Sequence, residues 1–195
     1  ERAKEESNIR FMTTQNISPE LNITILYERY GGKGILNKES TDDRTFSLTS
    51  NYLGKRYVVH AGYIFQSVKR EENGGVTDDT MVLDTTINPR AIGYNLKTAY
   101  NRLKRNSLFF THSYAIPIRL SKKDTLNNSR GTVAYIGHSF EYATYYRKYT
   151  DAIDLSDEVG RNYYNNRFFI NSLESNDSPR LNLIENRFFM RSAAS

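Results

Sequence analysis

Residues 45–68 read TFSLTSNYLGKRYVVHAGYIFQSV, a pattern typical of two β-strands joined by a tight turn. Side chains alternate in polarity along Thr45–Leu53 and, less cleanly, along Tyr57–Val68, and this period of two separates the faces of an extended strand. One face of each strand collects Phe46, Leu48, Ser50 and Tyr52, or Tyr57, Val59, Ala61, Tyr63 and Phe65. Gly54–Arg56 is short enough to close the hairpin between them.

The same alternation recurs along most of the chain. It predicts strands over Leu21–Glu28, Ile92–Asn101 and Val133–Tyr146, and weaker ones over Tyr163–Asn171 and Leu181–Met190. The split is cleanest in the second of these, where Ile92, Tyr94, Leu96, Thr98 and Tyr100 alternate with Gly93, Asn95, Lys97, Ala99 and Asn101. The chain is therefore expected to be all-β and antiparallel, with about eight strands.

The connections are expected to alternate in length. Gly54–Arg56 and Lys104–Asn106 are predicted tight turns, whereas the long polar stretches are Gly31–Arg44, Lys69–Arg90 and Ser121–Gly131. Short turns on one side and long loops on the other are typical of outer-membrane barrels. A further connection, Lys148–Arg161, is longer than this phase predicts and is interpreted as holding a short helical turn.

Composition narrows the function classes. Hydrophobic residues make up 38% of the chain and aromatic residues 13%, which suits a sheet with one apolar face and one wet face. The net charge of +5 comes without a basic stripe, so nucleic-acid binding is not predicted. The chain has no cysteine, which excludes disulfides and thiolate metal sites. The longest apolar run, Val133–Ile136, is far shorter than a membrane-spanning helix.

Alternation does not say whether the apolar face points outward to lipid or inward to a dry core. Strand length, loop asymmetry and tyrosines near strand ends favour a membrane barrel. The tyrosines expected to form an interfacial girdle are Tyr52, Tyr57, Tyr94 and Tyr114. A soluble β-sheet binding protein, with these rings in an ordinary core, stays open as an alternative.

Several segments together resemble the putative porins of Bacteroidetes. They are Tyr27–Gly32, Asn51–Tyr57, His60–Ile64, Glu72–Gly75 and Ser113–Ile118. The resemblance runs over roughly Phe11–Phe189 and implies a transmembrane β-barrel in the outer membrane of a Gram-negative bacterium. The end at Ser195 lacks an aromatic-ended final strand, so residues 1–195 are expected to be an internal part of one longer barrel domain. The resemblance brings no catalytic residue and no cofactor.

Catalytic and metal sites have weak support in the residues. His112 and His138 each precede a serine, but neighbours in a strand point to opposite faces, so neither pair forms a Ser–His hydrogen bond within its strand. Pairing across strands stays open. The carboxylates of Asp151, Asp154, Asp157 and Glu158 lack the order of a calcium loop and are interpreted as a solvated connector. No enzyme, metal or cofactor is expected.

The resulting hypothesis is an outer-membrane channel for passive diffusion of small solutes. The residues expected to face the lumen, from alternation alone, are Gln66, Asn95, Lys97, Asn101 and Glu141. The alternative is a barrel that serves as a scaffold subunit of an outer-membrane assembly. The expected partners are outer-membrane lipid, small solutes and, for the scaffold, other outer-membrane proteins.

Overall fold

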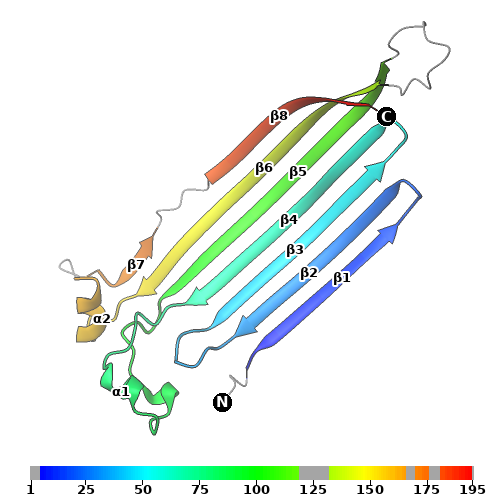
Figure 1. The fold of residues 1–195 in the computed structure, drawn as a ribbon. Helices are drawn as coiled ribbons and strands as arrows, with labels where there is room; N and C mark the ends of the chain where they lie inside the picture. Colours follow the sequence, from blue (N-terminus) through cyan, green and yellow to red (C-terminus); the bar gives the residue numbers. More distant parts are fainter. Residues whose placement is uncertain (1–4, 119–131, 166–169, 176–180, 195) are drawn as a thin grey trace, which may run out of the picture.

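A computed structural model describes residues 5–118, 132–165, 170–175 and 181–194. These residues form one antiparallel sheet that lies as a single layer of long strands (Figure 1). The strands are β1 (Ser7–Asn16), β2 (Leu21–Gly32), β3 (Thr41–Leu53), β4 (Tyr57–Glu71), β5 (Tyr100–Ile118), β6 (Thr132–Ala152), β7 (Ser172–Ser175) and β8 (Leu181–Ala194). Short helices occur only between strands within the described ranges: α1 (Thr80–Leu83), the 3-10 turn η1 (Pro89–Ala91) and α2 (Glu158–Tyr163).

Strands β1 to β6 are joined in chain order, each antiparallel to the one before it. β6 then has two partners on its far edge. Its Tyr149–Ala152 end pairs with β7, and its longer Thr132–Tyr145 part pairs with β8. The described strands leave β1 at one side and β7 with β8 at the other, so this sheet is open.

No second layer covers the sheet within the described residues. Extensive contacts between elements join hydrogen-bonded neighbour strands only. Most of the fully buried apolar side chains lie instead in the loops beyond the strands: Ile92, Leu96, Ala99 and Ile153. A search of the described helices finds none with the length and apolar character needed to cross a membrane.

Most predicted strands are confirmed, and each is longer than expected. Leu21–Glu28, Thr45–Leu53, Tyr57–Val68, Val133–Tyr146 and Leu181–Met190 lie within β2, β3, β4, β6 and β8. The hairpin turn at Gly54–Arg56 and the helical turn, now α2, are also confirmed. β1 was missing from the prediction, although Ile9 and Phe11 alternate with polar residues along it.

Two predictions around β5 are wrong. Ile92–Asn101 is almost entirely loop, and Lys104–Asn106 lies inside the 19-residue strand β5. The first error arises because this segment runs back against Glu72–Thr77, with Leu96 N–H donating to Asn73 at 2.8 Å, and so has the extended backbone of a strand without a regular ladder. The second arises because a charged triplet was taken for a turn, although it contains no glycine or proline.

Two further predictions concern the ends of the sheet. Tyr163–Asn171 is not a strand where it is described, since α2 continues to Tyr163 and β7 begins only at Ser172; residues 166–169 lie outside the described ranges. Ser121–Gly131 also lies outside them. The strand ends it connects pair as Ile118 with Thr132, at the end of the sheet that has the short turns, so the three long loops are not in phase.

Candidate functional site

The strand register divides the sheet into two faces of different character. One, called the apolar face, holds in its middle Ile23, Ile25, Phe46, Leu48, Val59, Tyr63, Phe65, Leu108, Phe110, Phe140, Tyr142 and Ile184. Leu48, Leu108 and Ile184 are 40%, 49% and 63% exposed. A contiguous exposed apolar surface of this extent marks contact with a membrane or a partner rather than with water.

A row of touching rings crosses the apolar face near the short turns. Tyr52 and Tyr57 have ring centroids 6.4 Å apart, and Tyr57 lies 5.7 Å from His112. His112 is directly opposite His138 at 5.7 Å, and His138 stacks on Phe188 at 4.7 Å. The row passes over β3, β4, β5, β6 and β8. On β5 it lies at His112, inside the apolar stretch that continues to Ile116.

Two of the expected girdle tyrosines need comment. Tyr114 is the register partner of Tyr57 and shares its face, whereas Tyr94 lies in the loop between β4 and β5, bridged to Val76, and belongs to no such row.

The structure also places the histidines of the alternative Ser–His pairs. The hydroxyl of Tyr57 contacts Nδ1 of His112 at 3.2 Å, while Ser139 bonds Thr111 on the other face, so these serines and histidines do not meet.

The height of the apolar surface is near that of the apolar band of a membrane barrel. On β5 it extends from Leu108 to Ile116, roughly 27 Å of strand at about 3.4 Å per residue. At a strand tilt of about 40° this spans roughly 21 Å, somewhat less than the apolar band of about 25 Å on outer-membrane barrels. β5 and β6, with 19 and 21 residues, continue well beyond it toward the long loops.

The opposite face, called the polar face, carries three of the five predicted lumen residues. Gln66, Asn101 and Glu141 share it by register. Glu141 accepts a hydrogen bond from Ser107 at 3.1 Å and lies 3.8 Å from the Arg105 guanidinium. Arg105 and Gln66 line a hollow of about 310 Å³. Arg105 was not among the predicted lumen residues, because Lys104–Asn106 was predicted to be a turn.

Buried polar atoms on the polar face point to hydration. Oδ1 of Asp43, Oδ1 of Asn101 and Nε of Arg105 have no hydrogen-bond partner in the described part of the protein. Such atoms are costly unless water reaches them. Some charges on this face are paired across strands, as in Arg10–Glu28 at 2.9 Å and Arg70–Asp43 at 3.9 Å. The face therefore has the chemistry of a water-lined wall.

The other two predicted lumen residues, Asn95 and Lys97, are not on a strand. Both lie in the loop between β4 and β5, where the Asn95 amide donates to the Gly74 carbonyl at 3.0 Å. Leu96 between them is 3% exposed and packs against Gly74, so it is not on the apolar face. The alternating pattern correctly indicated that Leu96 is more buried than Asn95 and Lys97. It was wrong in placing these residues on a strand.

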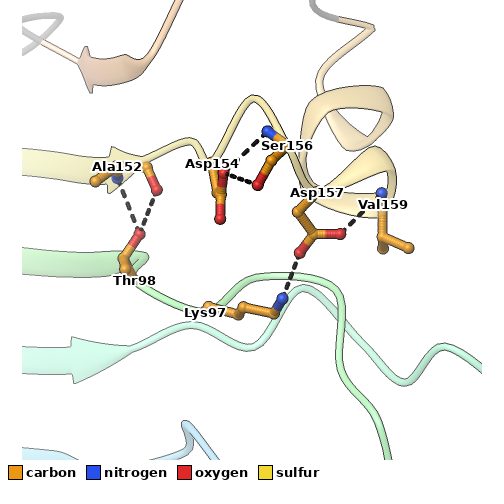
Figure 2. Close-up of polar contacts among 7 residues, drawn as sticks. All are labelled: Lys97, Thr98, Ala152, Asp154, Ser156, Asp157 and Val159. Atoms are coloured by element: carbon orange, nitrogen blue, oxygen red, sulfur yellow. Dashed lines mark hydrogen bonds and ion pairs between the residues drawn. The ribbon is translucent and has the colours of Figure 1, made fainter.

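The two long loops are tied together at their bases by polar contacts (Figure 2). The Thr98 hydroxyl donates to the Asp151 carboxylate at 2.5 Å and contacts the carbonyl and N–H of Ala152 at 2.8 and 3.0 Å. Lys97 forms an ion pair with Asp157 at 2.5 Å. Asp157 also caps α2 by accepting from the Val159 N–H at 3.2 Å. This cluster, the loop clasp, holds the β4–β5 loop against the β6–β7 loop.

The carboxylates of Asp151, Asp154 and Asp157 in the acidic connector accept hydrogen bonds from residues of the two loops. Asp151 accepts from Tyr164 at 2.9 Å as well as from Thr98, and Asp154 accepts from the N–H and hydroxyl of Ser156. Burial and a hydrogen bond with Tyr149 raise the pKa of the Tyr164 phenol. Among the described residues, no three histidine or carboxylate side chains gather as metal ligands.

The loop clasp should weaken at low pH. The hydrogen bond from Lys97 lowers the pKa of Asp157 below its ordinary 3.8, and the same contact raises the pKa of Lys97 above 10.5. The contribution of Asp157 to stability is therefore complete above pH 3.8 and is lost as the pH falls through its lowered pKa. That of Lys97 is complete below pH 10.5 and is lost as the pH rises through its raised pKa.

We expect the protection of the amides in 154–160 against exchange to fall below pH 3.8. Lys97→Met should remove the part of this fall that comes from the Lys97–Asp157 contact, and an unchanged fall in the variant would contradict the assignment.

Comparisons with known proteins agree with this architecture. A family model described as putative porin matches residues 1–193. Neither a curated protein nor a solved structure matches the chain. The match covers almost the whole length, including both faces of the sheet and the loop clasp. The chain therefore belongs to the putative porin family.

Proposed function

We propose that this chain forms part of the wall of an outer-membrane β-barrel that serves as a passive channel for small solutes. The observation that carries the proposal is the contrast between the two faces. One face presents an exposed apolar band crossed by an aromatic row, and the other presents paired and unsatisfied polar groups. In a barrel, the first face contacts lipid and the second lines the lumen.

The open edges of the described sheet fit this proposal because a strand that crosses lipid must pair all its backbone groups. Further strands would complete the barrel. Solutes would pass by diffusion along the polar face, without catalysis and without a cofactor, and membership of the putative porin family supports this use. The Bacteroidetes origin stays a prediction.

Conductance tests the proposal. The purified full-length protein should conduct ions in a planar bilayer, and Arg105→Glu should shift ion preference toward cations, because a charge on a narrow lumen wall acts on passing ions at short range. The shift should be largest at low salt, since screening lengths fall from about 30 Å at 0.01 M to about 10 Å at 0.1 M. Arg56→Glu, in the tight turn outside the wall, is the matched control and should leave preference nearly unchanged.

If the folded protein shows no conductance in a bilayer, the scaffold alternative is favoured. One structural feature supports that alternative. The helix α1 at the tip of the β4–β5 loop exposes Met81, Val82 and Leu83, the last at 84%. An apolar loop tip of this kind is a suitable docking point for another outer-membrane protein. Polar substitution of these three residues should then abolish co-purification of a partner while the barrel still folds.

A further inference from the structure

A belt of cations borders the apolar band on the side of the long loops. Two successive register rows beyond Phe46 and Phe65 on the apolar face carry Arg29, Arg44, Lys69, Arg102, Lys104 and Lys148, called the basic belt. The only acidic side chain in these rows is Asp42, which binds Arg29 at 3.0 Å and Arg44 at 2.5 Å. The belt therefore keeps an excess of positive charge directed outward, immediately next to the apolar surface.

The excess of positive charge in the basic belt is greatest on β5. Arg102 and Lys104 have no acidic partner within 4 Å in the part of the chain that the structure describes, and Lys69 lies over the Tyr100 ring at 5.0 Å. Arg102 and Lys104 also line a hollow of about 520 Å³ on the apolar face. Its other walls are Asn106, Tyr142, Thr144, Tyr145, Tyr146 and Asn182.

This hollow joins two kinds of surface. Tyr142 lies in the apolar band beside Leu108 and Ile184, whereas Lys104 and Arg102 lie in successive rows beyond its edge, with Lys104 the nearer. A molecule with an anionic head and apolar tails meets both surfaces at once, and a free inorganic anion meets only the cations. Juxtamembrane lysines and arginines attract anionic headgroups in the same way.

We propose that the basic belt binds the phosphate headgroup of anionic lipids, with Arg102 and Lys104 as the principal contacts and the acyl chains lying along Leu108, Tyr142 and Ile184. The inference rests on the proposed membrane barrel, since it requires the apolar face to contact lipid. It adds a specific lipid site at the long-loop edge of the band, on the outside of the wall and separate from the proposed lumen.

The test measures binding of dioleoyl phosphatidylglycerol to the detergent-solubilised full-length protein by native mass spectrometry. Arg102→Gln combined with Lys104→Gln should weaken binding roughly 30-fold, because each basic side chain near an anionic lipid contributes about fivefold. The control, Arg70→Gln with Arg147→Gln, removes the same charge from the polar face of neighbouring strands and should change binding less than threefold. Millimolar inorganic phosphate should not displace the lipid.

Each result of these binding measurements either supports or overturns the proposed lipid site. Equal losses in the two double variants would show a response to net charge alone and overturn it, as would unchanged binding in the Arg102/Lys104 variant. Displacement by inorganic phosphate would show an anion site without acyl-chain contacts and would also overturn it. Conductance of the wild type in neutral lipid is measured in parallel. If conductance persists and lipid selectivity is absent, the lipid site fails alone; if the protein is soluble without detergent, the barrel fails with it.

Discussion

Leu48→Arg should prevent most of the protein from assembling in the membrane, whereas Ser47→Arg should not. Leu48 lies within the apolar band, in the register row of Tyr63 and Leu108, and is 40% exposed, so in a barrel its side chain contacts lipid. An arginine facing lipid costs up to roughly 2–4 kcal/mol, the value at the midplane, which lowers the equilibrium constant for folding by a factor of at most about 30 to 1,000. Ser47 points to the polar face, where an arginine stays hydrated.

The measurement is the fraction of each variant that migrates as the heat-modifiable folded form after extraction of outer membranes. Both variants add the same residue to the same strand, so strand propensity and net charge are matched. A loss of assembly in Ser47→Arg with a normal Leu48→Arg would show that the faces are reversed. Equal assembly of both would remove the argument for lipid contact.

Leu96→Ala should loosen the loop clasp without affecting the barrel. Leu96 is 3% exposed among loop residues, and truncation of a buried leucine typically costs about 2–5 kcal/mol. That cost falls on a small local core, so the β4–β5 loop should open far more often and become sensitive to protease. Leu83→Ala in the same loop is the matched control, because that side chain is 84% exposed and has little packing to lose.

Limited proteolysis of both variants in detergent, with membrane assembly measured beside it, separates the possibilities. Faster cleavage in Leu96→Ala with normal assembly is the expected result. If Leu96→Ala instead impaired assembly while the loops kept their protection, Leu96 would belong to the membrane wall. The placement of Ile92–Asn101 outside the sheet would then be wrong.

The regular strands were predictable because their alternating polarity has a single physical cause, the different surroundings of the two faces of the sheet. In Thr45–Val68, alternation, length and a turn with glycine all favour the same hairpin, and the register confirms it. Ile92–Asn101 shows the same alternation in polarity but does not form a strand. Its buried residues are Ile92, Leu96 and Ala99, which are spaced by four and three positions, so burial in this loop does not follow the period of two and the alternation alone does not indicate a sheet.

The prediction of lumen-facing residues depended on strand placement, and it stays a prediction. Gln66, Asn101 and Glu141 share the polar face by register, although Asn101 was assigned from Ile92–Asn101, which is almost entirely loop. The ring row could not be read from the sequence, because its members come from five strands and depend on register. His112 and His138 meet only because β5 and β6 pair with no offset between these residues.

In the proposed barrel, the abrupt change from Phe65 to Lys69 on the same face of β4 would also fix how deep the protein lies in its bilayer. A vertical shift by one register row would bring Arg44 and Lys104 into hydrocarbon on one side and leave Ile116 in water on the other. A difference between the thickness of the bilayer and the height of the apolar band is therefore accommodated by the lipid, which deforms more easily than the protein. In a membrane thicker than the apolar band, the lipid should thin around the wall, and the protein should keep its depth.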